Sequence, residues 1–455
     1  MTSIRFVGLD VHRESVRACV RDPENRIVAE QSFGCTREAL ETFARTHLSK
    51  QDAVALEATF HTWAIVDVLA PFVGRVVVSN PLATKAIAES KVKTDKVDAR
   101  VLSELLRCDY LPEVWTPDAA TRERRSMCAR RAGLVSDLVR TKNRIHSVLA
   151  KALVPKPKGE LFDGKGRAWL ATLDLPEPAR LQIQSDLRIL ALAEAELEAH
   201  DRELVRRAWA DPRVKLLITM PGVDVTVALA ILAAVGDIAR FRDGDHLAAY
   251  LGLVPSIRQS GAHCYLGSIT KRGNGKARWL LIQAAQHLAG HPGPLGVFFR
   301  RLAHRKNRNV AVVATARKLA VIAWRMLKGN EPYRYAQPKP TQDKLARLRI
   351  RATGARRKGG LAKGTARPAA YGTGQRTRTT RALPRLYAAE GLPEALGPER
   401  LKAAEQRILR QMGVEDFVGA IQSDIVEPRP HKRAAGNQPS AVTSEGGQNA
   451  TKSAG

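Results

Sequence analysis

Apolar and polar positions over the first hundred residues form a pattern that predicts strands separated by helices. Short apolar stretches there have the length and composition of strands. They are Ile4–Leu9, Ser15–Arg21, Ala53–Glu57 and Arg75–Ser79. Helical periodicity separates them at Arg37–Leu48 and Thr62–Phe72. This alternation is typical of an α/β domain, which we predict for residues 1–117.

The pattern becomes helical after residue 117. Two long amphipathic stretches, the first basic and the second more acidic, flank the Pro-rich break Val154–Gly159. They predict a coiled-coil hairpin or a dimer seam over residues 118–212. A compact, mostly helical region with polar interruptions follows over residues 213–335 and is predicted to be a separate domain.

The composition changes again beyond residue 335. The segment Lys344–Arg381 is crowded with Arg, Lys, Gly and Thr and has almost no apolar periodicity, so we expect that it does not fold by itself. A short helix is predicted within Pro398–Ile421, and the end of the chain has low complexity. We therefore expect residues 336–455 to form a basic, largely disordered tail.

The charge of the chain predicts a polyanionic partner. Its 455 residues include 74 Lys and Arg against 45 Asp and Glu, a net charge of +29, and nucleic acid is the simplest partner for such a balance. The first residues lack the apolar segment of a signal peptide, and the longest apolar run, Val225–Val235, is shorter than the roughly 20 residues that span a membrane. We expect a cytoplasmic, nucleoid-associated protein with no membrane partner. The five scattered cysteines support neither a disulfide framework nor a zinc ribbon.

Four separated acidic residues carry the main chemical pattern. Asp10 lies at the tip of the first predicted strand, and Glu57 closes the third in the same way. Asp95 and Asp98 are spaced i,i+3, which places both on one face of a helix. Hard oxygen ligands of this kind suit Mg²⁺. If the four acids converge, they are suited to a pair of Mg²⁺ ions about 3.5–4 Å apart, an arrangement that promotes phosphodiester displacement.

Each of these acids also has a purely structural explanation. An aspartate after a strand is commonly a turn former, and Asp95 suits the N-cap of the helix that follows it. The neighbouring Lys91 and Lys93 belong either to a solvated basic face or, beside a metal site, to a surface that contacts DNA phosphates.

Three polar segments within residues 213–335 hold further candidates. Gly222, in Pro-Gly-Val before an apolar helix, suits a phosphate-binding helix-hairpin-helix turn, although an ordinary helix–helix turn fits equally. Ser260 precedes a glycine in a polar loop that also contains Arg258. This is an accessible place for a nucleophile, although most loop serines are only hydrogen-bonded or solvated. The third segment is a phosphate-binding turn or a solvated one. Its candidate contacts are Lys271, Arg272 and Asn274.

In this order and spacing, the motifs resemble those of the DEDD-type transposases of bacterial insertion sequences, which are related to site-specific DNA invertases. The matching segments are Gly8–His12, Leu56–Thr59, Lys93–Ala99, Pro221–Val223, Gly252–Pro255, Gln259–Gly261 and Lys271–Asn274. The resemblance covers about residues 1–335. Each motif is loose by itself, and their order makes the match specific.

The resemblance implies a RuvC-like, RNase H-type N-terminal domain in which Asp10, Glu57, Asp95 and Asp98 bind Mg²⁺. It also implies a mostly α-helical transposase domain in which Ser260 attacks a DNA phosphate and forms a phosphoserine link, so that strands are rejoined without ATP. Such proteins are guided by a structured RNA, made from the ends of the element, that pairs with donor and target DNA. They act as homo-oligomers, dimers or tetramers, in which the metal site and the serine come from different subunits.

Two features depart from the family pattern. Many relatives carry a second serine where this chain has Gln259, so Ser256 and Ser268 remain alternative nucleophiles. The tail after residue 335 extends beyond the pattern and is either an arm that binds RNA or DNA or a remnant with no role.

Two other functions remain open at the level of sequence. A RuvC-like, structure-selective nuclease uses the acidic site with metal-activated water and needs no serine. A non-enzymatic, basic nucleic-acid-binding protein explains the charge alone. The order of the motifs favours a recombinase over both.

Overall fold

The computed structural model describes residues 4–87, 95–155, 157, 159–260, 263–354, 377–395 and 397–428. The chain divides into two compact units, Met1–Asp118 and Ala119–Gly455, called here unit 1 and unit 2. Apart from residue 118, the three regions predicted after residue 117 lie within unit 2. No helix in the described part of the chain is long and apolar enough to cross a membrane.

Unit 1 contains a five-stranded sheet with the order β3-β2-β1-β4-β5. Its strands are β1 (Phe6–Val11), β2 (Ser15–Arg21), β3 (Ile27–Gly34), β4 (Ala53–Glu57) and β5 (Arg75–Ser79). Strand β2 runs antiparallel to both β1 and β3, whereas β4 runs parallel to both β1 and β5. The prediction of a mixed α/β domain is confirmed, but β3 was not predicted because its side chains are mostly exposed and lack an alternating apolar face.

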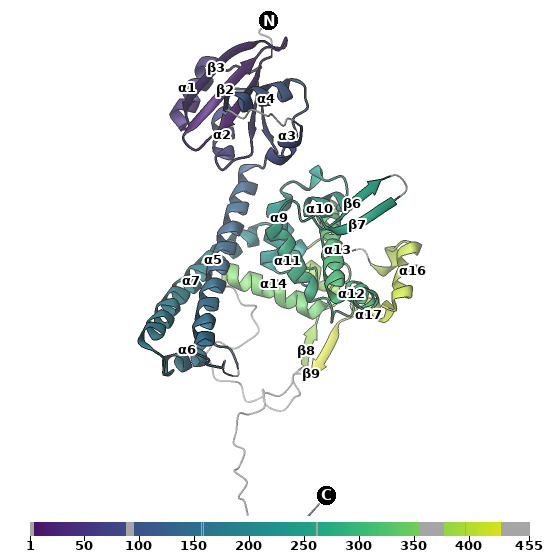
Figure 1. Cartoon of the computed structure of the whole chain (residues 1–455). Helices are drawn as coiled ribbons and strands as arrows, with labels where there is room; N and C mark the ends of the chain where they lie inside the picture. The colour runs from purple at the N-terminus through teal and green to yellow at the C-terminus, as the bar shows by residue number, and fades with distance from the viewer. Residues whose placement is uncertain are drawn as a thin grey trace, which may run out of the picture. The chain divides into compact units, whose positions relative to one another are not determined.

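Helices cover both faces of this sheet (Figure 1). They are α1 (Arg37–His47), α2 (Thr62–Leu69), α3 (Pro81–Ile87) and α4 (Asp95–Arg107). Residues of α1 and α2 share one apolar core with Leu9 and Leu56. On the other face, Leu102 and Leu106 of α4 pack with Ala55 and Val77. Neighbouring residues of a strand contribute to different cores, because successive side chains point to opposite faces of the sheet.

Unit 2 begins with a long helical hairpin. Helices α5 (Ala119–Lys151) and α7 (Glu177–Ala210) pack against each other, and the short α6 (Gly164–Ala171) lies between them in the chain (Figure 1). Ion pairs tie the two long helices together, with Arg131 Nε 2.7 Å from Asp201 Oδ1 and Arg144 Nη2 2.6 Å from Asp186 Oδ1. The predicted pair of long helices is therefore present.

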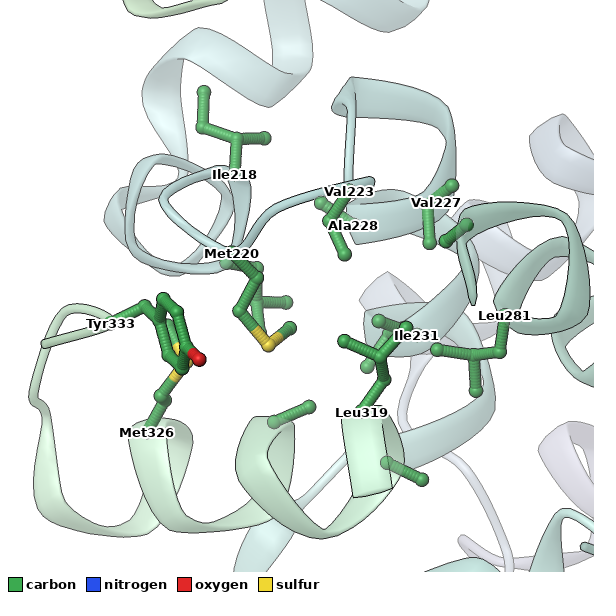
Figure 2. Packing of buried hydrophobic residues seen from close by; sticks show 14 of the residues in the cluster. Ile218, Met220, Val223, Val227, Ala228, Ile231, Leu281, Leu319, Met326 and Tyr333 are labelled. Atoms are coloured by element: carbon green, nitrogen blue, oxygen red, sulfur yellow. The ribbon is translucent and has the colours of Figure 1, made fainter. Parts of the chain in front are cut away.

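The largest core of the molecule lies in the remainder of unit 2. Its first elements are α8 (Pro212–Ile218), α9 (Val225–Val235), the 3₁₀ turn η1 (Ile238–Arg240), α10 (Gly244–Tyr250), α11 (Gly275–Gln286), α12 (Pro294–Arg305) and α13 (Arg308–Gly329). Every residue of α9 from Val227 to Val235 is buried, as expected for a helix that is apolar on all sides. Figure 2 shows Met220, Ile231 and Leu319 from separate segments directed into this core.

The expectation of a largely disordered tail after residue 335 is wrong for much of the described part. Here the chain forms α14 (Pro338–Thr353), β8 (Thr377–Thr380), α15 (Leu383–Ala389), η3 (Pro398–Arg400), α16 (Ala403–Met412), α17 (Glu415–Ala420) and β9 (Ile425–Pro428). Leu345, Leu348 and Tyr387 belong to the same core as α9 and α13. Few apolar residues are enough here because they fill an existing core and do not have to form one. The single helix predicted within Pro398–Ile421 is two helices, α16 and α17.

Candidate active site

Asp10 lies near the end of β1, the central strand of the unit 1 sheet. Its side chain is 17% exposed, and its Oδ2 lies 3.1 Å from Nε2 of His12. On the antiparallel side, Asp10 is paired with Arg17 of β2. Paired residues of neighbouring strands point to the same face, so Arg17 lies beside this carboxylate.

Glu57 closes the strand on the other side of β1. The parallel register pairs Leu9 with Leu56, so the next residues, Asp10 and Glu57, lie at the same edge of the sheet on adjacent strands. Leu9 and Leu56 face the core under α1 and α2. Because side chains alternate along a strand, Asp10 and Glu57 point to the opposite face, which α4 covers.

Helix α4 lies directly on β1. A Cβ atom added to Gly8 would lie only 2.1 Å from the carbonyl oxygen of Ala99 and 2.6 Å from the backbone nitrogen of Ser103. Only glycine permits this approach, since any larger residue at position 8 would push the helix away. Asp98 directly precedes Ala99 and is therefore held close to β1.

The direction of α4 decides which of its ends meets the acids. Its last residue, Arg107, donates from Nη1 to the carbonyl oxygen of Pro23 at 3.4 Å, beyond the end of β2. That end of β2 pairs with the start of β1, where Phe6 faces Arg21. The first turn of α4, with Asp98, therefore lies toward the opposite end of β1, which carries Asp10. We call Asp10, Glu57, Asp95 and Asp98 the acidic edge.

The donor set of the acidic edge suits a hard cation, but the described atoms do not form a complete metal site. Within the described part of the chain, no three Asp, Glu, His or Cys side chains are grouped closely enough to hold a metal ion. Asp95 begins α4, but its side chain lies outside the described atoms. Lys91 and Lys93, the predicted phosphate contacts, also lie outside the described residues. The role of each acid as a ligand stays a prediction.

Arg17 and His12 were not among the residues predicted for the site. In the described structure, Nε of Arg17 is buried and has no hydrogen-bond partner. Strand pairing places Arg17 beside Asp10, and such pairing between strands cannot be read from a single short motif. A cation next to neighbouring carboxylates reduces their mutual repulsion, which is the effect that we expect of Arg17 on Asp10 and Glu57.

Ser260 is the last residue of β6 (Pro255–Ser260), which forms a hairpin with β7 (His263–Ile269). The prediction of a polar loop is therefore wrong, because Ser260 pairs with His263 within a strand. Both strands are exposed for most of their length, so they lack the buried face that makes a strand visible in sequence. Ser260 itself is exposed, as a nucleophile requires.

The two alternative serines lie elsewhere on this hairpin. The Ser256 hydroxyl donates to the carbonyl oxygen of Ser268 at 3.1 Å. A Cβ added to Gly267 would lie 2.4 Å from that hydroxyl, so Ser256 fits closely against the opposite strand. Ser268 is exposed. Arg258 is exposed two residues before Ser260 and so lies on the same face of its strand.

The turn from Lys271 to Asn274 has a structural function that was not predicted. Asn274 caps α11, because its side-chain oxygen accepts from the backbone N–H of Ala277 at 3.0 Å. Gly273 has a φ of +72°, and a Cβ there would lie 1.9 Å from the carbonyl oxygen of Tyr250. Lys271 and Arg272 remain exposed, so the cations of this turn are still accessible to a phosphate.

Gly222 forms the turn between α8 and α9. It has a φ of +76°, and a Cβ there would lie 2.4 Å from the carbonyl oxygen of Ala284. Asp224 caps α9 by accepting from the N–H of Val227 at 2.9 Å. The predicted pair of helices joined by a tight turn is present. Close packing requires a glycine at position 222 whether or not a ligand binds there.

Lys344 of α14 contacts this turn from a segment predicted to be disordered. Its ammonium donates to the carbonyl oxygens of Met220 at 2.6 Å and Val223 at 3.1 Å. Burial lowers the pKa of Lys344 to about 7, against a smaller opposing effect of Asp224. This lysine was not predicted because nothing local distinguishes it from the other basic residues of its segment.

Two family models match the chain. Residues 7–153 match a DEDD transposase model of the IS110 type, described as "Transposase". Residues 214–296 match a model described as "Transposase IS116/IS110/IS902 family". Together they cover half of the chain, and they include every predicted site residue.

Individual proteins give the same result. A "Probable family 20 transposase" of Pseudomonas aeruginosa is 29% identical over 256 residues, which are 53% of this chain and 74% of that protein. The "Transposase for insertion sequence element IS1111A" of Coxiella burnetii is 37% identical over 139 residues, 30% of this chain and 38% of that protein. The "Transposase for insertion sequence element IS1328" of Yersinia enterocolitica is 26% identical over 334 residues, 71% of this chain and 97% of that protein.

Proposed function

This chain belongs to the IS110-type family of insertion-sequence transposases, enzymes that cut and rejoin DNA, and we propose that it does so with the acidic edge of unit 1 and Ser260 of unit 2. The observation that carries the proposal is the placement of Asp10 and Glu57 on neighbouring strands at one edge of the sheet. Asp10 and Glu57 end adjacent parallel strands on one face, and the first turn of α4 lies over the same end of β1.

The acidic edge is proposed to hold divalent cations, two Mg²⁺ ions in a RuvC-like domain. Asp10, Glu57, Asp95 and Asp98 would supply the carboxylate oxygens that such ions prefer. When bound, a pair of ions stabilises the negative charge that develops on the oxygens of a phosphodiester during displacement. Arg17, beside Asp10, would offset part of the repulsion between the carboxylates.

Ser260 is proposed as the nucleophile. Its Oγ attacks a backbone phosphorus atom, an Oγ–P bond forms, and the bond from phosphorus to a deoxyribose oxygen breaks. The serine proton ends on the released sugar hydroxyl. In the reverse direction, the hydroxyl of another strand attacks the phosphoserine and restores the serine. Because one phosphate ester replaces another, rejoining needs no ATP. The exposed position of Ser260 at the end of β6 supports this role.

The proposed partners follow from charge and family. The net charge of +29 suits donor and target DNA. Three exposed cations near Ser260 in the chain are suited to bind phosphates of the strand that is cut. They are Arg258, Lys271 and Arg272. We propose further that a structured RNA from the element guides the choice of sites and that the protein acts as a homo-oligomer.

The proposal is tested by trapping the protein–DNA link. Purified protein with its bound RNA is incubated with Mg²⁺ and a labelled plasmid that carries the element ends, and adducts are separated on a denaturing gel. We expect Ser260→Ala to lower adduct formation roughly 100-fold or more, because the attacking oxygen is absent. Ser268→Ala removes an exposed hydroxyl from the same hairpin and should retain activity, whereas loss of the adduct in this variant would move the nucleophile to Ser268.

Two further variants separate this proposal from the alternatives. Asp10→Asn should abolish Mg²⁺-dependent cleavage. Persistence of cleavage in this variant would refute the proposed role of the acidic edge. Cleavage without any adduct in the unaltered protein would favour a nuclease that uses water. An adduct that survives Ser260→Ala but disappears in Ser256→Ala would move the nucleophile to Ser256. Full activity after ribonuclease treatment would refute the guide RNA.

A further inference from the structure

A cavity of about 560 Å³ lies beside the turn that joins α8 and α9. Three segments surround it: the turn itself at residues 219–224, residues 287–291 that follow α11, and residues 337–347 at the start and middle of α14. The family models end at residue 296, so α14 is a part of the wall that neither of them covers.

Several basic side chains line the cavity. Lys339, Lys344 and Arg347 come from α14, and His287 and His291 come from the opposite side. Two acids also line the cavity. One of them, Asp224, already accepts the N–H of Val227 as a helix cap.

The two outer cations are accessible. Lys339 and Arg347 are exposed, and in the part of the chain that the structure describes neither forms an ion pair. Nε of Arg347 donates to the carbonyl oxygen of Asp343 at 3.3 Å. Their spacing of eight residues places both on one side of α14, because 3.6 residues make a turn.

Lys344, the innermost of the three, is half-buried. The Lys344 ammonium has three N–H groups, and the carbonyl oxygens of Met220 and Val223 accept from two of them. Carbonyl oxygens carry only partial charge, so the positive charge is not neutralised there, and burial lowers the pKa of Lys344 to about 7. An anion in the cavity would compensate this charge.

We infer that this cavity binds a phosphate of the DNA backbone, with Lys339 and Arg347 as the outer contacts and Lys344 as the inner one. The inference rests on the proposed function, because the family supplies DNA as the polyanion. It assigns α14 a binding role that the sequence motifs do not contain. The contact is to the backbone and not to bases, so it anchors DNA irrespective of sequence.

The binding test uses the full-length protein in the Ser260→Ala form, without divalent metal, and a short fluorescent DNA duplex of arbitrary sequence. Anisotropy titrations at several salt concentrations give both the affinity and its salt dependence. We expect Lys339→Ala/Arg347→Ala to weaken binding about 10-fold. The slope of log K against log salt should fall by about 0.9 for each phosphate that the protein no longer neutralises.

Arg351→Ala is the matched control. Arg351 is an exposed arginine of the same helix, and it does not line the cavity. The control should leave affinity within about twofold and the slope unchanged. Because all three side chains are exposed, circular dichroism should show equal melting temperatures for these proteins.

Three outcomes would overturn the inference. The first is an unchanged slope in the double variant. The second is an equally weakened affinity for the duplex in Arg351→Ala. The third is a double variant that binds a single-stranded RNA probe more weakly but binds the duplex as before. The readout needs neither cleavage nor the serine. A failure of the proposed chemistry therefore leaves this test intact, and a failure here leaves the adduct test intact.

Discussion

Gly8 positions the acidic edge through the side chain that it lacks. Backbone atoms of α4 lie where a Cβ of residue 8 would be, so the helix contacts β1 two residues before Asp10. The distance between a helix axis and a sheet normally depends on the side chains between them. At Gly8 no side chain separates the helix from the strand, so the first turn of α4 lies close to the end of β1.

His291 gives unit 2 a dependence on pH. It is 6% exposed, its Nδ1 accepts from the backbone N–H of Gly293 at 3.1 Å, and burial, with Lys344 and Arg300 nearby, lowers its pKa to about 4. The unfolded chain binds a proton at this residue near pH 6.5. Between pH 6.5 and 4 the unfolded state therefore holds more protons, so the stabilisation present above pH 6.5 is lost as the pH falls toward 4.

We expect protonation of His291 to lower the free energy of unfolding by on the order of 3 kcal/mol as the pH falls from 7 to 4. Urea unfolding of the full chain at several pH values measures the decrease, and His291→Asn, which keeps an acceptor for Gly293, should show a smaller one. Equal pH dependence in the two proteins would mean that His291 titrates normally when folded.

Helix α14 shows how an element can be stable where its sequence suggests disorder. Leu345 and Leu348 are each 1% exposed and pack into the core of unit 2. Arg349 Nη1 lies 3.0 Å from Oε1 of Glu390, which is itself buried. The helix is stabilised by contacts with α7, α8 and α15 and not by its own periodicity.

We expect Leu345→Ala and Leu348→Ala each to lower the free energy of unfolding of unit 2 by about 2–5 kcal/mol, because each leaves a cavity in a closed core. Chemical denaturation monitored by circular dichroism measures the change. Ile350→Ala on the same helix, where the side chain is 37% exposed, should cost clearly less. Similar small effects for all three would indicate that α14 is only loosely attached.

At the scale of the whole molecule, the two units have separate cores. The buried residues of unit 1 cluster on the two faces of its sheet, and those around α9 and α13 form another core with contributions from α14 and α15. Each unit therefore has the buried apolar surface that independent folding requires.

We expect a fragment of residues 1–118 to unfold in one cooperative transition. A fragment of residues 119–335 should not, because it lacks Leu345, Leu348 and Tyr387 from its core, whereas residues 119–428 should. Thermal circular dichroism and proton–nitrogen NMR spectra of the three fragments provide the comparison. Cooperative folding of residues 119–335 would show that α14 and α15 are dispensable for this core.

The sequence by itself determined the parts whose pattern is local. Strands such as Ala53–Glu57 and helices such as Val225–Val235 are confirmed, because a buried face imposes a period on nearby residues. The order of the short motifs was enough to indicate the family, which the family models confirm.

Only the tertiary structure decided the features that depend on distant residues. The neighbouring places of Asp10, Glu57 and Arg17 follow from strand pairing, and the hydrogen bond from Lys344 to Met220 joins residues 124 positions apart. The β6–β7 hairpin and α14 also escaped prediction, the first because it has no buried face and the second because the core that it completes belongs to other segments. Local periodicity reports only what a segment buries by itself, and long-range packing supplies the rest.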